Sequence, residues 1–152
     1  MRESIWKWHH NISECFYHIQ LTVKYRRKAL TPEVETVIRT TCEEFKYRYH
    51  LDIKTLGFDQ DHVHFYLQAL PKYSGGQIIR LIKSITASEV FKHNEKVKEM
   101  LWGGEFWTDG YYIGTVSPHG NKEVIINKEV IINYIKNQGR GKGVPQLKLF
   151  NF

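Results

Sequence analysis

His62 and His64 stand one residue apart in the segment DHVHF. The flanking residues alternate between polar and apolar types, which is typical of a strand with one buried face. Residues i and i+2 of a strand point to the same side, so both imidazoles would leave the sheet together. That spacing can present two nitrogens to one divalent ion. Such pairs also arise by chance, and from the pair alone a purely structural role is the simpler interpretation.

A tyrosine and a glutamine near the end of the chain, Tyr134 and Gln138, are spaced i and i+4. On a helix this spacing places the two side chains one above the other. Tyrosine can act as a covalent nucleophile, and a glutamine oxygen can ligate a hard metal ion. The alternative is an amphipathic core tyrosine followed by a solvent-exposed glutamine. Without the histidines we would favour that alternative.

The elements that must position these residues follow from hydrophobic periodicity. Period-two alternation predicts strands at 15–25, 51–58 and 62–70, the last two as a hairpin around a short polar turn. Helical spacing predicts helices at 32–49, at 76–101 with a break near Asn94, and at 121–139, ending at Gly139. The aromatic and glycine-rich segment 102–116 predicts one or two short strands. Asp61, in the polar turn, could support a histidine, although an acid in a turn needs no such role.

This order of elements predicts an α+β fold, an antiparallel ferredoxin- or RRM-like sheet with helices on one face and Tyr134 on the C-terminal helix. One domain spans 1–152, with a core at about 15–139 and a flexible basic tail at 140–152. The two best strands share an apolar face: Tyr17, Ile19, Leu21, Val23, Val63, Phe65, Leu67 and Ala69. Their other face carries His18, Gln20, Thr22, Lys24, His62, His64, Tyr66 and Gln68. A solvated face is the simplest explanation, but histidines and amides are unusual choices for one.

Charge gives a further indication of function. The formal net charge is +6, with 22 Lys and Arg against 16 Asp and Glu. A positive balance favours a polyanionic partner such as nucleic acid, although a basic soluble protein explains it equally well. The densest cluster is Lys24, Arg26, Arg27 and Lys28. It could bind the DNA backbone, and a solvated charged run is the equal alternative.

Cysteines and hydropathy indicate where the protein would act. Cys15 and Cys42 are far apart and match no metal-binding spacing. Two such cysteines suggest thiols in a reducing cytoplasm. No stretch approaches the ~20 apolar residues of a membrane span, and the N-terminal segment does not resemble a signal peptide. A cytoplasmic, nucleoid-associated protein is therefore expected.

Several segments together resemble one known family. DHVHF followed by the late NYIKNQ resembles the HUH-type single-tyrosine transposases, the TnpA enzymes of very small bacterial and archaeal insertion sequences. KYRRKAL, LIKSITASEVFK and LWGGEFWTDGYYIGTV agree with that family in the same order. The resemblance covers about 15–139. The doubled NKEVII at 121–132 departs from it and leaves the start of the last helix uncertain.

The resemblance implies a metal-assisted enzyme that cleaves and rejoins single-stranded DNA. By position, His62, His64 and Gln138 would be the metal ligands and Tyr134 the nucleophile, which would form a 5′-phosphotyrosine and release a 3′-hydroxyl. The family acts as a homodimer and recognises imperfect hairpins at the element ends, and we expect the active sites to be shared between subunits. Imidazole and amide ligands with phosphate oxygens suit Mg²⁺ or Mn²⁺, whereas Zn²⁺ would favour cysteine or a third histidine.

Three alternatives stay open. A domesticated relative that processes repeated chromosomal hairpins would carry the same residues. A catalytically inactive DNA-binding regulator would share the fold, although the intact histidines, tyrosine and glutamine argue against it. An unrelated metallohydrolase built on His62 and His64 lacks a nearby cluster of further ligands.

Overall fold

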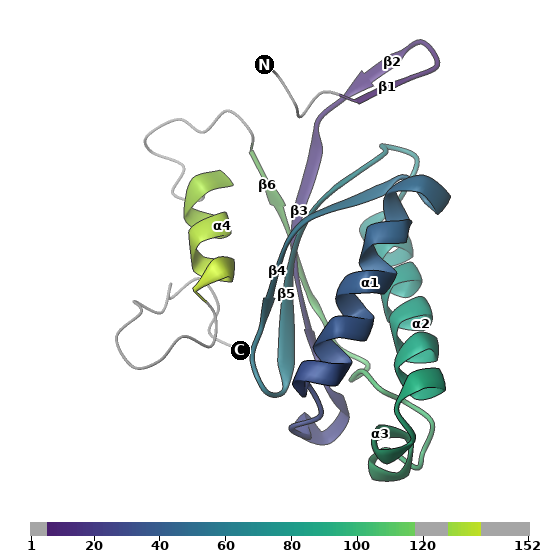
Figure 1. The fold of residues 1–152 in the computed structure, drawn as a ribbon. Helices are drawn as coiled ribbons and strands as arrows, with labels where there is room; N and C mark the ends of the chain where they lie inside the picture. The colour runs from purple at the N-terminus through teal and green to yellow at the C-terminus, as the bar shows by residue number, and fades with distance from the viewer. Residues whose placement is uncertain (1–5, 118–127, 138–152) are drawn as a thin grey trace.

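A four-stranded antiparallel sheet forms the centre of the computed structural model, which describes residues 6–117 and 128–137. Its strand order is β4-β5-β3-β6. The strands are β3 (Cys15–Thr22), β4 (Leu51–Phe58), β5 (His62–Ala69) and β6 (Tyr112–Val116). A separate hairpin, β1 (Trp6–Trp8) and β2 (Asn11–Ser13), precedes the sheet and projects from one end of it (Figure 1).

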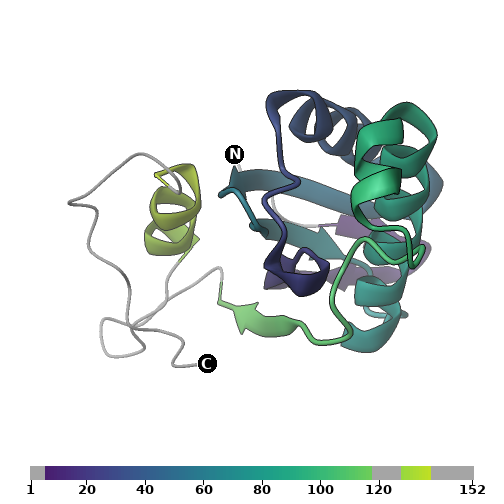
Figure 2. The ribbon, with the colours of Figure 1, turned by 90° about the horizontal axis from the view of Figure 1, so that it is seen from below.

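Helices cover both faces of the sheet. α1 (Pro32–Arg48) and α2 (Gly75–His93) lie side by side on one face, and α4 (Lys128–Lys136) lies on the opposite face (Figures 1 and 2). Two short helices, η1 (Lys24–Arg26) and α3 (Glu95–Met100), complete the elements of the described residues. α1 begins where the Thr31 side chain accepts from the Val34 amide, and α2 begins with a capping box of Ser74 and Gln77. These caps fix where each covering helix starts.

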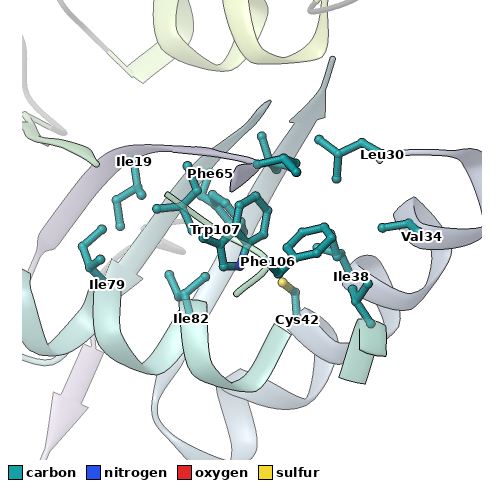
Figure 3. Packing of buried hydrophobic residues seen from close by; sticks show 14 of the residues in the cluster. Ile19, Leu30, Val34, Ile38, Cys42, Phe65, Ile79, Ile82, Phe106 and Trp107 are labelled. Atoms are coloured by element: carbon teal, nitrogen blue, oxygen red, sulfur yellow. The ribbon is translucent and has the colours of Figure 1, made fainter. Parts of the chain in front are cut away.

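The main core lies between the sheet and the pair α1 and α2. The predicted apolar face supplies its strand residues, with Ile19, Leu21 and Phe65 fully buried. Figure 3 shows Phe65 packed among side chains from the helices and from the segment that holds Phe106 and Trp107. Burying each large side chain of this kind contributes roughly 1.5–3 kcal/mol. This core makes the sheet a rigid platform for whatever its other face carries.

The predicted α+β class with an antiparallel sheet is confirmed, but helices lie on both faces rather than on one, because α4 packs on β4 and β5 from the side opposite α1 and α2. The first strand ends at Thr22, before the predicted 25, because Tyr25 and Arg26 take left-handed φ values of 58° and 52° and the chain turns into η1. The break near Asn94 is confirmed, since α2 and α3 meet there. Segment 102–116 forms one strand, β6, and a single bridge from Trp107 to Val23. The β1–β2 hairpin was not predicted.

Other sequence expectations lie partly outside the described residues. The predicted helix 121–139 is described only as α4, so residues 121–127 and the end at Gly139 are not tested, nor is the tail 140–152.

Cys15 and Cys42 are both free thiols, and burial raises the pKa of Cys42 to about 12. Within the ranges 6–117 and 128–137, none of the helices combines the length and the apolar character that crossing a membrane requires.

Candidate active site

The sheet face that carries the histidines is covered rather than solvated. His18, His64, Tyr66 and Gln68 are all at least 99% buried. Part of the cover is α4, whose Ile135 is fully buried in a second apolar cluster. That cluster also contains Phe16, Tyr66 and Val116, with Ile132 and Tyr134 packed against it. The unusual composition of this face is therefore explained by an interior site between sheet and helix.

His62 and His64 lie side by side on β5, as their spacing predicts. Their ring centroids are 5.2 Å apart and the rings are nearly perpendicular, at 79°. On the neighbouring strand β3, Thr22 stands opposite His62 and Gln20 opposite His64. His64 is deep in the site, whereas the His62 side chain is 21% exposed. One edge of the pair is thus open to a ligand from solvent.

Tyr134 reaches this pair from the opposite layer. Its ring centroid lies 5.3 Å from that of His64, with the two planes at 85°. Burial, with a smaller contribution from the nearby Asp59 carboxylate, raises the pKa of Tyr134. The phenol is therefore protonated at neutral pH and must lose its proton before it can attack. Tyr66, the other tyrosine of this face, is fully buried, and burial raises its pKa to about 12.

Both histidines are oriented through their Nδ1 atoms. His62 Nδ1 lies 2.7 Å from Asp61 Oδ1, so the support that the sequence suggested for Asp61 is present. His64 Nδ1 lies 2.9 Å from Nε2 of His18. A neutral imidazole that donates from Nδ1 carries its lone pair on Nε2. The Asp61 contact suits the arrangement that metal-ligating histidines adopt, and His64 adopts the same arrangement if it, rather than His18, carries the proton that the two rings share.

The residues present fit a divalent ion. His64 Nε2 is buried and has no hydrogen-bond partner in the part of the chain that the structure describes. A buried polar atom of this kind costs roughly 1–3 kcal/mol unless something binds it, and an ion would do so. In the same part of the chain, no cluster of three or more His, Cys, Asp or Glu could hold a metal.

Gln138, the predicted third ligand, lies outside the described residues. The last described residue before it is Asn137, whose amide donates to the Asn133 carbonyl at 3.1 Å. Helical hydrogen bonding therefore continues to the position just before Gln138. Its role as a ligand stays a prediction.

A glycine on β4 lets α4 approach the sheet closely. Gly57 stands directly opposite His64 in the β4–β5 pairing. A Cβ atom added at Gly57 would lie 2.7 Å from Cγ2 and 2.9 Å from the carbonyl carbon of Ile135, and closer still to its carbonyl oxygen. Any side chain there would push against the helix backbone. Gly57 thus sets the depth at which the helix of Tyr134 sits above the histidines.

The predicted basic cluster begins at the histidine end of the sheet. Val23, which precedes it, donates its amide to the Asp61 carbonyl at 2.8 Å. Lys24 is paired, with its Nζ 2.6 Å from Glu105 Oε2. Arg26, Arg27 and Lys28 are exposed. The cluster is therefore near the site, and its DNA contacts stay a prediction.

Exposed aromatic side chains stand beside this cluster. Tyr25 is 77% and Trp102 90% exposed, and both line a hollow that Lys24 and Arg27 also line. Trp107 of the same segment is buried in the main core, whereas Trp102 is exposed in the single chain.

Two residues of the site were missed by sequence reasoning, His18 and Gly57. His18 alternates onto the same face as the histidine pair, which was a usable signal. A glycine within a predicted strand indicates a close backbone approach, which was the signal for Gly57.

The chain is similar in sequence to known transposases. The model of the family described as "Transposase IS200 like" matches residues 11–138. The chain is 31% identical to the ISDra2 transposase TnpA of Deinococcus radiodurans over 108 residues, 71% of this chain and 77% of that protein. It is 30% identical to the transposase for insertion sequence element IS200 of Salmonella typhimurium over 133 residues, 85% of this chain and 80% of that protein.

Two solved structures share the fold. A candidate transposase from Deinococcus radiodurans R1 superposes with a TM-score of 0.66 at 26% identity, over 88% of this chain and 98% of that one. A REP-associated tyrosine transposase bound to a REP hairpin gives a TM-score of 0.54 at 11% identity, over 87% of this chain and 70% of that one. At that identity the second likeness concerns the fold alone. The family match and both curated relatives agree that this chain belongs to the IS200-like transposase family.

Proposed function

We propose that this transposase cleaves and rejoins single-stranded DNA at insertion-sequence ends, with Tyr134 as the nucleophile. The observation that carries the proposal is the meeting of Tyr134 with His64, 5.3 Å between ring centroids, beside the second histidine of the pair. Tyr134 comes from a helix on the far side of the sheet from α1 and α2, so the contact depends on tertiary structure. A nucleophile placed against a pair of potential metal ligands suits phosphoryl transfer.

The proposed chemistry balances without an external energy source. The Tyr134 oxygen forms a bond to the scissile phosphorus as the bond from phosphorus to the 3′-oxygen breaks. The phenol gives up its proton and the leaving 3′-oxygen gains one, which yields a 5′-phosphotyrosine and a 3′-hydroxyl. Attack by a 3′-hydroxyl on the phosphotyrosine reverses the exchange and joins two DNA ends. The phosphoester bond energy is kept in the covalent intermediate.

The metal would be held by His62, His64 and Gln138. Mg²⁺ or Mn²⁺ in this position would polarise the scissile phosphate and stabilise negative charge on its oxygens. The chain's own part is to aim the two imidazoles, through Asp61 and His18, and to exclude water from the buried side of His64. The buried, unpaired His64 Nε2 supports this assignment.

The DNA partner is proposed to be a single strand with hairpin ends. The net charge of +6 and the exposed Arg26, Arg27 and Lys28 beside the histidine end of the sheet support backbone binding. The REP-associated transposase, which shares the fold, is bound to a hairpin. Such a substrate would place the protein at the nucleoid in the cytoplasm.

A homodimer with active sites shared between subunits is the proposed assembly. In the single chain, α4 packs on its own β4 and β5. The resemblance to a homodimeric family of transposases supports the proposal that this helix serves a partner's sheet instead.

Two other functions would use the same fold. A domesticated relative that processes chromosomal hairpins would differ only in its DNA target. An inactive DNA-binding regulator would need no nucleophile, and the contact between Tyr134 and His64 argues against it.

Covalent capture of DNA tests the proposal. The purified protein is incubated with labelled single-stranded element ends and Mg²⁺ or Mn²⁺, and the products are separated on a denaturing gel. Wild type should give a protein–DNA band. Tyr134→Phe, which removes only the hydroxyl, should keep DNA binding and lose the band. An adduct of equal yield in the Phe variant would show that the nucleophile is a different residue.

A further inference from the structure

His64 is the inner, more deeply buried histidine of the pair. Within the described part of the chain, His18 is the one residue that shares a hydrogen bond with a ring nitrogen of His64. It lies on β3, two residues before Gln20, which stands opposite His64. Diagonal neighbours on one face of an antiparallel pair lie within reach of long side chains. His18 Nε2 is 2.9 Å from His64 Nδ1, and the two rings lie 5.2 Å apart at 24°. Both side chains are 1% exposed.

The hydrogen bond between them holds one proton. Both rings are almost completely buried, and burial disfavours the charged form of an imidazole. Both rings are therefore neutral at pH 7, and each carries a single N–H. Either His64 donates from Nδ1 or His18 donates from Nε2. Only the first arrangement leaves a lone pair on His64 Nε2, the atom that would have to face an ion.

The surroundings of His18 fix its ring. Tyr112 lies against it edge-on, with centroids 5.6 Å apart. Gly114 stands opposite His18 in the β3–β6 pairing. A Cβ atom at Gly114 would lie 3.1 Å from Cζ of Tyr112, so the missing side chain makes room for that tyrosine. The acceptor for His64 is thus packed between Tyr112 of β6 and His64 itself on β5.

We propose that His18 is a positioning residue: it accepts the Nδ1 proton of His64 and thereby commits His64 Nε2 to metal binding. The role matches that of Asp61 at His62, where a carboxylate contacts the same ring atom. The two metal ligands would then be oriented by different chemistry, a partly exposed acid at the outer one and a neutral imidazole at the inner one. A carboxylate in place of His18 would bury a charge, which costs far more than a neutral acceptor. The inference rests on the proposed function, because it assigns a role toward the same metal.

Nitrogen-15 NMR of the metal-free wild type tests the tautomer directly. We expect the His64 proton on Nδ1 and a scalar coupling across the hydrogen bond to His18 Nε2. A His64 proton on Nε2, or no coupling between the two rings, would overturn the proposal. This measurement requires no metal and no DNA, so it decides for or against His18 even if the wild type proves unable to bind Mn²⁺, a result that would defeat the proposed function.

Calorimetric titration of Mn²⁺ supplies the second test. His18→Phe keeps the ring volume and removes the acceptor, so affinity should fall about 10–100-fold. His18→Gln keeps an acceptor oxygen at similar reach and should stay within a few-fold of wild type. His93→Phe, which removes an exposed histidine on α2, is the matched control and should bind as wild type does. Wild-type Mn²⁺ affinity in a folded His18→Phe would refute the positioning role. If that variant fails to fold, a loss of Mn²⁺ affinity in His18→Gln as large as that in His64→Ala would refute it.

Discussion

Replacing Gly57 with alanine should uncouple the nucleophile from the histidines. The new Cβ would stand 2.7 Å from Cγ2 of Ile135, short by 0.7 Å of the 3.4 Å at which ordinary contact begins. The carbonyl oxygen of Ile135 lies closer still, and it belongs to the backbone of α4, so a side-chain rotation cannot relieve the clash. We expect α4 to shift outward by about 1 Å. Tyr134, the preceding residue, would move with it.

The magnitude follows from two known sensitivities. A misplacement of 1 Å in an active site can cost about 10²-fold in rate. Overpacking a close contact costs roughly 1–3 kcal/mol of stability, less than most domains possess, so the variant should fold. The rate of covalent adduct formation should therefore drop about 100-fold while the protein remains folded. DNA binding should change little, because the substitution leaves the side chains of the exposed basic cluster unchanged.

Single-turnover adduct formation on labelled single-stranded DNA is the assay. Gly103→Ala is the control, because a Cβ atom there meets nothing within 4 Å. Adduct formation at the wild-type rate in a folded Gly57→Ala would refute the reasoning. It would mean that Tyr134 acts from a position other than the one in which α4 rests on Gly57.

Three further predictions concern pH, salt and assembly. Burial lowers the pKa of His18 to about 4 and that of His64 to about 3, whereas a histidine in the unfolded chain has a pKa near 6.5, so the unfolded chain binds more protons below pH 6.5. The free energy of unfolding of the metal-free protein should therefore fall as the pH drops from 6.5 toward 4. The loss should reach up to about 1.4 kcal/mol per pH unit for each histidine. Urea midpoints at about pH 7 and pH 5 measure it, and equal midpoints would contradict it. The protein should bind a DNA hairpin more tightly than the corresponding plain duplex. The double substitution Arg26→Gln with Arg27→Gln should reduce the slope of log affinity against log salt concentration by roughly 0.7 per lost phosphate contact. The control Arg48→Gln, at the other end of the sheet, should leave that slope unchanged. The variants Tyr134→Phe and His64→Ala should each be inactive alone, and mixing them should partly restore cleavage if the active sites are shared between subunits. A mixture that stays inactive after verified subunit exchange would indicate that each subunit contains its whole active site.

Periodicity along single strands predicted a large part of this site. His62 and His64 lie on one face of β5 because strand side chains alternate, and no tertiary information was needed for that. The apolar face of β3 and β5 was predicted correctly for the same reason. The start of α1 at Pro32 followed from local capping chemistry. Each of these features is decided within a few residues of chain.

Features that depend on register were out of reach. Whether His18 or Gln20 contacts His64 depends on how β3 is aligned with β5 and on how the rings lean, and a one-residue slip would move every side chain to the other face. The burial of the histidine face depended on α4, which lies far along the chain from β5. A solvated face was the simplest explanation of its polar residues, although histidines and amides were unusual for one, and the packing of Ile135 and Tyr134 on that face excludes it.

The two missed residues explain why a polar face can be buried at low cost. A helix can lie on it only where the sheet offers space, and Gly57 provides that space directly opposite His64. The polar atoms beneath then need partners, and His18 provides one for the inner histidine without adding charge. The site therefore has two separate requirements. Gly57 on β4 leaves space for α4 above His64, and His18 on β3, on the other side of β5, provides the hydrogen-bond acceptor beside it. A site of this kind therefore depends on three adjacent strands in register, and substitutions at Gly57 and His18 should impair it by different routes, the first through the position of Tyr134 and the second through the affinity for metal.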